Sequence, residues 1–167
     1  TTMKKKISQL FTWMGTRIGQ FIVGTFLLLV VITFSIFKIW DISSAPYVEM
    51  KQHATQVARD YADIQTVDTF SIYNSSETYY SIIGVDSEGQ SLAVIIPENS
   101  NTVFVYPMEN GISKDEAQTV AKENGAGQVE RVLLGIRDDK PIWEVKSGTA
   151  YYLVEFETGS FVKKEGL

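Results

Sequence analysis

Residues 18–37, IGQFIVGTFLLLVVITFSIF, are twenty consecutive positions without a charged side chain. An uncharged apolar run of this length crosses the hydrocarbon core of a bilayer, about 30 Å thick, when it folds as a helix. Trp13 and Trp40 lie on either side of the run, as aromatic residues do at the two interfaces of a membrane. The run therefore predicts a single transmembrane helix over residues 18–40, with the rest of the chain divided between the two sides of one membrane.

Basic residues are concentrated on the N-terminal side of this span. The first 40 residues contain five basic residues, three of them at positions 4–6, and no acidic residue. Segments that stay in the cytoplasm are enriched in Lys and Arg close to a span. We therefore expect residues 1–17 in the cytoplasm and everything after Trp40 outside it, which makes this a single-pass protein of the cell membrane.

A cleaved signal peptide is the alternative interpretation of the same run. Such peptides have an apolar core of about 7–15 residues followed by a small-x-small cleavage site. The core is longer here, and Pro46 directly follows Ala45, the last small residue of the only nearby candidate site. The sequence therefore favours a permanent anchor.

The part beyond the span is strongly acidic. Residues 41–167 carry all 20 acidic residues and 10 of the 15 basic ones, a net charge of −10. This balance argues against nucleic acid as a partner, because nucleic-acid binding relies on basic surfaces. The chain has no cysteine, so the outer part cannot hold disulfides and must be stabilised by hydrophobic cores.

A first α+β domain is expected at residues 47–107, after a short linker at residues 41–46. Pro46 is typical of the first turn of a helix. Five residues then repeat on one helical face: Met50, Ala54, Val57, Ala58 and Tyr61. Strand-like runs follow at residues 67–73, 78–85, 91–96 and 102–106, with turn-forming residues between them.

A second domain of the same plan is expected at residues 112–167. Ser113 and Glu116 form a capping box, which predicts a helix that ends at residues 124–125, Asn-Gly. Strand-like runs follow at residues 129–136, 142–146, 150–156 and 161–163. The fold class is therefore α+β: a transmembrane helix, then two tandem small domains, each one helix packed on an antiparallel meander.

The second half resembles a PepSY domain. The resemblance lies in the helix at 113–124, in residues 142–145 (IWEV) and in residues 151–159 (YYLVEFETG). The short basic start, the single span and two tandem small domains also resemble the TseB (YpmB) group of Gram-positive bacteria. That resemblance implies a cystatin-like or PepSY-like fold for each half. It also implies a role as a regulator of cell-wall elongation that associates with a penicillin-binding protein transpeptidase, and it carries over no catalytic residue.

The residues themselves offer little catalytic chemistry. His53 is the only histidine, and without cysteine it cannot build a histidine- or thiolate-based metal cage. We therefore expect no catalytic residue, no metal and no cofactor. The one candidate pair of glycan-cleaving carboxylates is Glu155 and Glu157, which we expect to share one face of a strand with Phe156 on the other. The same alternation is typical of any half-exposed hairpin.

Two surfaces are candidates for binding a partner. In the membrane, Gly15, Gly19 and Gly24 are small residues that let another helix approach closely, and Gln20 offers an interhelical hydrogen bond. Plain anchoring in lipid remains the alternative for this face. Outside, the pairs Tyr79–Tyr80 and Tyr151–Tyr152 lie on expected strands, so one member of each pair should point away from its core. Exposed tyrosines are good anchors for a protein partner, although these rings can equally cover sheet surface.

The sequence is compatible with three functions. The first is a non-enzymatic, membrane-anchored regulator that binds a penicillin-binding protein or another elongation protein. The second is a regulator or inhibitor of an extracytoplasmic peptidase, as the PepSY resemblance implies. The third is a wall-glycan hydrolase that uses Glu155 and Glu157. The sequence favours the first, with the membrane and a cell-wall protein as partners and with neither nucleic acid nor a small-molecule substrate.

Overall fold

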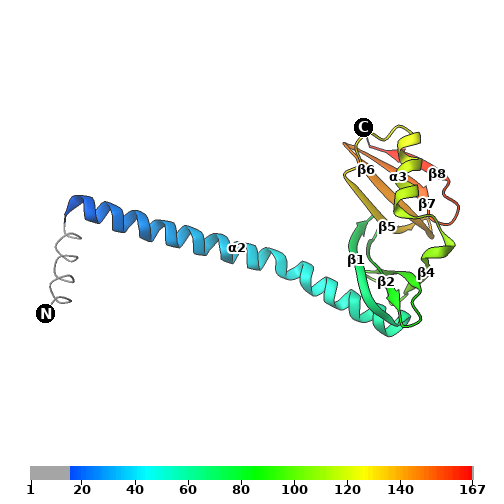
Figure 1. Cartoon of the computed structure of the whole chain (residues 1–167), viewed down its shortest axis with the longest axis horizontal. Helices are drawn as coiled ribbons and strands as arrows, with labels where there is room; N and C mark the ends of the chain where they lie inside the picture. Colours follow the sequence, from blue (N-terminus) through cyan, green and yellow to red (C-terminus); the bar gives the residue numbers. More distant parts are fainter. Residues whose placement is uncertain (1–15, 167) are drawn as a thin grey trace. The chain divides into compact units, whose positions relative to one another are not determined.

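The computed structural model describes residues 16–166, apart from the side chains of residues 41–45. The chain divides into two compact units, Thr1–Val48 and Glu49–Leu167. The described part of the first unit is helical, and the second contains two four-stranded antiparallel sheets (Figure 1). The protein is therefore a mixed α+β chain with an N-terminal apolar helix, as the sequence predicts.

Helix α2 (Arg17–Ala62) begins with a side-chain cap. The backbone N–H of Gly19 donates to the Thr16 hydroxyl at 3.1 Å, which satisfies one of the unpaired donors of the first turn. Its segment Arg17–Trp40 is long and apolar enough to cross a membrane, and its side chains are mostly exposed, while Gly19 is buried. By length and composition this segment is compatible with a membrane anchor or a signal sequence.

The structure differs from the sequence interpretation at residues 41–46. We expected a linker there, with a new helix starting at Pro46, but α2 continues through these residues with Pro46 inside it. An interior proline removes one backbone hydrogen bond, and its ring crowds the carbonyl four residues earlier, which often kinks or ends a helix. Here α2 is continuous through Pro46, so the proline marks no helix start.

Sheet A is the four-stranded meander of the first half. Its strands are β1 (Ile64–Asn74), β2 (Thr78–Asp86), β3 (Ser91–Pro97) and β4 (Phe104–Pro107), in that spatial order. A single residue, Asp63, joins α2 to β1 with φ of 51°, a left-handed conformation that aspartate tolerates better than most residues. The pairing of β1 with β2 shifts register twice, which marks bulges in this edge strand.

Both faces of sheet A are covered. On one face Ala54 and Ala58 of α2 are fully buried, in a cluster with Ile82 and Val94. The opposite face belongs to a second cluster, which includes Tyr73, Tyr79, Ala93 and Ile95 together with residues of the second half. Tyr61 departs from the expected helical stripe, because it is exposed.

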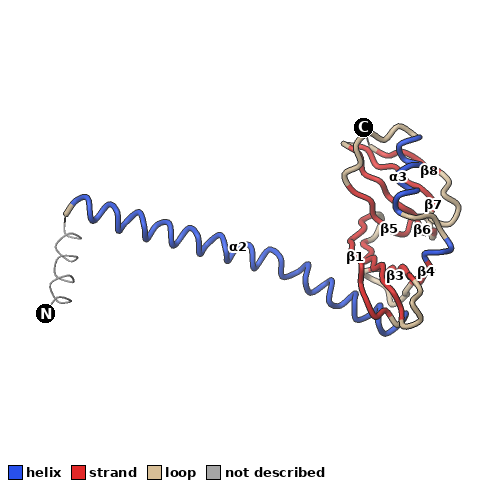
Figure 2. Tube along the Cα trace, in the orientation of Figure 1, coloured by secondary structure: helices blue, strands red, loops and turns tan. Residues whose placement is uncertain are grey.

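Sheet B is the meander of the second half. A 3₁₀ turn η1 (Met108–Asn110) and helix α3 (Lys114–Glu123) precede it. Its strands are β5 (Arg131–Arg137), β6 (Lys140–Ser147), β7 (Ala150–Glu155) and β8 (Phe161–Glu165), again in sequence order. Figure 2 shows the two sets of strands and the short helix α3 beside the second set.

The predicted capping box at the start of α3 is confirmed. The Ser113 hydroxyl accepts from the Glu116 N–H at 3.3 Å, and the Glu116 carboxylate accepts from the Ser113 N–H at 2.7 Å. These hydrogen bonds, the backbone one first, lower the pKa of Glu116. Ala117 and Ala121 are the buried residues of this helix, so the short helix presents its small side chains to the core.

The two halves share one hydrophobic core. The ring of Tyr73 on β1 lies directly over Gly135 on β5, where a Cβ would clash with it. Trp143 on β6 is almost fully buried in the same cluster, and its Nε1 donates to the Ile112 carbonyl at 2.9 Å. A glycine is needed at position 135 because the aromatic ring packs against the backbone itself. The two meanders thus share one of the two hydrophobic clusters and belong to one compact unit.

Candidate functional site

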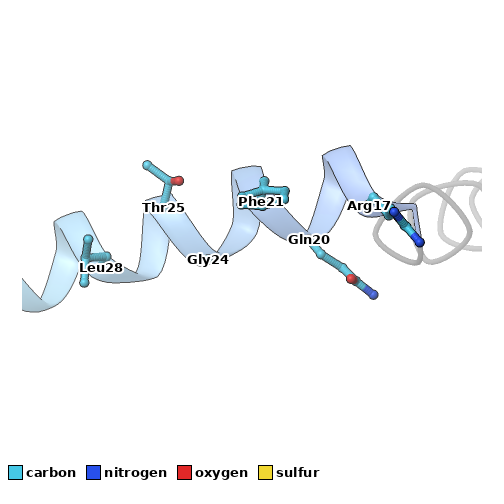
Figure 3. A pocket seen from close by; sticks show the side chains of 6 residues that line it. All are labelled: Arg17, Gln20, Phe21, Gly24, Thr25 and Leu28. Carbon is cyan, nitrogen blue, oxygen red and sulfur yellow. The ribbon is translucent and has the colours of Figure 1, made fainter.

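The predicted membrane face lies on the first turns of α2. Gln20 and Gly24 border a shallow groove of ≈ 440 Å³ together with Arg17, Phe21, Thr25 and Leu28. Figure 3 shows Gln20 and Thr25 projecting from opposite sides of the helix, with the ribbon bare at Gly24 between them. Gly19 lies on the same turns, whereas Gly15 lies outside the described residues.

This groove is open in the structure. A Cβ placed on Gly24 would meet no atom within 4 Å, and Phe21 and Leu28 are largely exposed. Further along the helix the Thr33 hydroxyl donates to the Leu29 carbonyl at 2.8 Å, so this polar group is satisfied within its own helix, as a span requires. Gly24 thus leaves open space on this face, and docking of a partner helix there stays a prediction.

The tyrosine pair of sheet A corrects one expectation. Tyr79 and Tyr80 point to opposite faces, as strand alternation predicts, yet they are only 9% and 8% exposed. Both faces of the sheet are covered, so neither ring lies on the surface. The Tyr80 hydroxyl donates to Glu98 at 2.8 Å, and burial is the largest cause of its raised pKa, followed by the hydrogen bond to Glu98.

The second tyrosine pair divides between core and surface. Tyr152 is buried, and its hydroxyl donates to the Gly125 carbonyl at 2.8 Å, which ties β7 to the residues just after α3. It is therefore structural and not an exposed anchor. Tyr151 is half-buried, with its ring at the edge of a hollow on sheet B. Of the four tyrosines proposed as a partner surface, Tyr151 alone keeps substantial exposure.

The glutamates weighed as a glycan-cleaving pair do not share a strand. Strand β7 ends at Glu155, and Glu157 lies in the following turn. Glu155 accepts from Lys140 and Thr158 at 2.7 Å and 2.5 Å. These hydrogen bonds, that from Lys140 first, lower its pKa. A general acid needs a raised pKa, so the environment of Glu155 opposes that role.

His53, the only histidine of the sequence, lies at an exposed position. It is exposed on α2, at the border of a small hollow of ≈ 280 Å³ that Tyr61, Tyr80 and Glu98 also line. Within residues 16–166, no three His, Asp or Glu side chains gather as a metal site would require. The position is consistent with a solvated helix residue.

The structure assembles one cluster that the sequence did not indicate. A hollow of ≈ 340 Å³, named the charged hollow here, is lined by Asn74, Arg131, Arg137, Glu144, Tyr151 and Glu165 among others. These residues come from β1 and from all four strands of sheet B. The available signal was Glu144, a carboxylate in the middle of the apolar run IWEV. Buried charges of this kind are rare unless they are paired or functional.

The fold defines a class of mixed α+β proteins with an apolar N-terminal helix and two antiparallel meanders. Helix α2, whose N-terminal part is apolar and long enough to cross a membrane, leads directly into the first antiparallel meander, and α3 precedes the second. Among the described residues, a shallow groove lies on the first unit and a polar hollow on the second.

Several known proteins are similar to this chain in sequence or structure. Residues 53–97 match the family model described as "Cell wall elongation regulator TseB-like domain". "Probable cell wall elongation regulator TseB" of Bacillus subtilis (strain 168) is 28% identical over 145 residues, which cover 83% of this chain and 88% of that protein. The structure of the YpmB protein from Bacillus subtilis matches with a TM-score of 0.63 and 26% identity, over 70% of this chain and 96% of that one.

These matches confirm the resemblance to the TseB group. The chain carries a TseB-like domain, has a YpmB-like fold and is homologous to a probable cell wall elongation regulator over most of both lengths. The PepSY-like and cystatin-like assignments, and the boundaries of two tandem domains, stay predictions.

Proposed function

We propose that this protein is a membrane-anchored, non-enzymatic regulator of bacterial cell-wall elongation that binds a penicillin-binding protein transpeptidase. The observation that carries the proposal is the similarity to a probable cell wall elongation regulator, which extends over 83% of this chain. The apolar segment Arg17–Trp40 supports anchoring, and the excess of basic residues before it supports a cytoplasmic N-terminus.

A binding role agrees with the chemistry of the outer unit. The strand-borne carboxylates Glu155 and Glu165 are held in ion pairs with lysine and arginine, at 2.7–2.8 Å. Such pairs keep carboxylates ionised, which suits a folded scaffold better than proton transfer. The regulator therefore acts by contact, and its partner performs the chemistry.

The span contributes to this binding by confinement. Two proteins held in one membrane meet at a high effective concentration, so that weak contacts inside and outside the bilayer add to a stable association. The bare ribbon at Gly24, flanked by Gln20, is the face proposed for contact with a partner helix.

In-cell photo-crosslinking tests the partner. A crosslinking amino acid placed at Tyr61, Tyr151 or Gly24 samples an exposed helix position, the half-buried tyrosine and the membrane face. We expect a penicillin-binding protein among the products. Capture of a secreted peptidase instead would favour the PepSY-type alternative, and the absence of any wall-synthesis protein from all three positions would contradict the proposal.

Complementation of a deletion strain tests the anchor. The full chain is compared with soluble residues 41–167 and with a chimera in which a generic single-pass helix replaces residues 18–40, all at equal abundance. We expect the soluble form to fail. Full rescue by the soluble form would contradict anchoring, whereas rescue by the chimera would show that the span only tethers.

A further inference from the structure

The charged hollow lies on the face of sheet B opposite to Trp143. Side chains alternate along a strand, so Glu144 points away from the core that Trp143 enters. The hollow measures ≈ 340 Å³, a volume within the range of small-molecule sites, about 300–1,000 Å³. Its lining is mainly polar, and most of the polar atoms belong to charged side chains.

Glu144 is a buried carboxylate without a close partner. Its side chain is only 10% exposed, and the nearest basic atom, Nη2 of Arg131, lies 3.9 Å from its Oε1. That distance is too long for a hydrogen bond. Burial is the largest influence on the pKa of Glu144 and raises it, while the charge of Arg131 acts in the opposite direction. An incompletely paired buried carboxylate is costly to the fold, which makes it a candidate for binding.

The second ion pair of the hollow, Arg137–Glu165, is joined by a hydrogen bond. Arg137 donates to Glu165 at 2.7 Å, and Lys163 also contacts Glu165 at 2.8 Å. Arg131, in contrast, has a side chain that is 52% exposed. The hollow therefore contains one closed pair, Arg137–Glu165, and one open pair, Arg131–Glu144, whose members face each other without touching.

The open pair is diagonal across two neighbouring strands. Leu133 on β5 lies opposite Glu144 on β6, and Arg131 is two residues from Leu133 along the same strand. Diagonal neighbours of this kind lie within reach of long side chains. A hydrogen-bond acceptor and a cationic donor are therefore presented side by side at one end of the hollow, with the half-buried ring of Tyr151 at its border.

We propose that the charged hollow binds the head group of an α-amino acid, whose ammonium donates to Glu144 and whose carboxylate accepts from Arg131. A simple cation would pair with Glu144 but would meet two arginines, and a simple anion would pair with Arg131 but would lie against Glu144. A zwitterion whose ammonium and carboxylate are attached to one carbon satisfies both members of the open pair. Such a ligand was not expected from the sequence, and its binding is independent of the proposed contact with a transpeptidase.

Calorimetric titration of the full chain in detergent micelles tests this site. The probes are glycine and two blocked analogues, N-acetylglycine, which lacks the ammonium, and glycinamide, which lacks the carboxylate. We expect saturable binding of glycine and affinities at least about tenfold lower for both analogues, as the loss of a charged hydrogen bond implies. No saturable binding of glycine, or equal affinity for the blocked analogues, would overturn the proposal.

Variants assign the binding to the open pair. Glu144→Gln and Arg131→Gln should each lower glycine affinity by about tenfold or more, whereas the exposed controls Glu88→Gln and Lys114→Gln should leave it unchanged. Thermal unfolding of each variant checks the fold. Glu144→Gln removes a buried charge and Arg131→Gln changes a half-exposed side chain, so we expect both variants to fold. Wild-type affinity in both would contradict the assignment.

A parallel titration distinguishes the two sources of such a head group. A soluble wall peptide that carries a free α-amino-acid head group is compared with glycine under the same conditions. Tighter binding of the peptide assigns the ligand to the cell wall, and equal or weaker binding assigns it to free amino acids. Failure of both probes overturns this inference, while crosslinking to a transpeptidase still decides the proposed function separately.

Discussion

Sheets A and B follow the same plan but lie in different surroundings. The central strands β2 and β3 of sheet A are mainly apolar on both faces, and Ser81 is the only buried polar residue of the sheet among those described. Sheet B has α3 and apolar side chains on one face and the charged hollow on the other. The ion pairs recorded among the described residues all fall within residues 130–165. A repeated order of helix and strands therefore does not determine what each face of a sheet contacts.

The different surroundings of the two sheets suit them to different roles. Sheet A serves as a layer in the middle of the unit, with α2 on one side and the shared core on the other. Sheet B keeps its charged face available. Of the two, sheet B is the better place for a recognised ligand, and sheet A is the part whose packing holds the unit together.

Core truncations should give the largest effects and test whether the halves unfold together. We expect Trp143→Ala in sheet B to cost about 3–5 kcal/mol and Ile82→Ala in sheet A about 2–5 kcal/mol, since both are almost fully buried. Urea unfolding of the full chain in micelles, followed by circular dichroism, should show one transition that both variants weaken. Val105→Ala, at a 40% exposed position, should change little. Two transitions, each shifted by only one variant, would indicate independent tandem domains.

A methyl group at the junction should give the next largest effect. Gly135→Ala places a Cβ against the ring of Tyr73, and overpacking of this kind costs about 1–3 kcal/mol. The matched control is Gly127→Ala, where the nearest atom, Ser147 Oγ, is 3.7 Å away. The denaturation midpoint measures both. Equal midpoints for the two variants would show that β1 and β5 are not tightly packed.

Loss of the cap on α3 should be smaller. Ser113→Ala removes the acceptor for the Glu116 N–H, at a cost of about 1 kcal/mol. Ser91→Ala, at an exposed strand start, serves as the control and should remain within about 0.5 kcal/mol of wild type. Because α3 covers sheet B alone, this variant measures how much sheet B depends on its own helix. A midpoint identical to that of the control would mean that packing alone holds α3.

The pH dependence of two glutamates should give the smallest effects, with opposite signs. Burial raises the pKa of Glu144 above its unfolded value, so its ionisation destabilises the fold at neutral pH. We expect Glu144→Gln to have a higher melting temperature than wild type at pH 7. The difference in melting temperature should shrink as the pH falls toward about 4, where Glu144 becomes protonated.

Glu130 is the opposite case, because the hydrogen bond from Lys146 and the charge of its ammonium lower the pKa of Glu130. Ionised Glu130 stabilises the fold, so Glu130→Gln should be less stable at pH 7, and its gap should close as the pH falls below the usual range of a glutamate. Thermal melts of both variants against wild type, at intervals from pH 7 to about pH 3, measure the two gaps. Parallel pH profiles for the two variants would contradict the difference in burial between these two carboxylates.

Local patterns predicted the elements of this fold well. Every strand-like run coincides with a strand, and the capping box at Ser113 is present as expected. Strand ends were less accurate: β1 begins at Ile64 rather than 67, because the left-handed Asp63 turns the chain within one residue. Alternation and capping depend on neighbouring residues, which the sequence displays directly.

Features that depend on distant residues were not predictable in the same way. Alternation sends Tyr79 and Tyr80 to opposite faces, but it does not reveal that both faces are covered. The charged hollow brings Asn74 beside residues that lie 57–91 positions further along the chain. Its members become neighbours only after both meanders have formed and packed, so no local motif marks the site.

The edges of the two sheets have a consequence for crowding. A protein confined to a membrane, as proposed, meets copies of itself at high local concentration, and exposed strand edges then tend to pair between molecules. Three of the four outer strands have features that oppose such pairing: β1 is bulged, β4 has only four residues and ends in Pro107, and β8 carries Lys163 and Lys164. At these three edges, pairing between the sheets of neighbouring copies is therefore disfavoured.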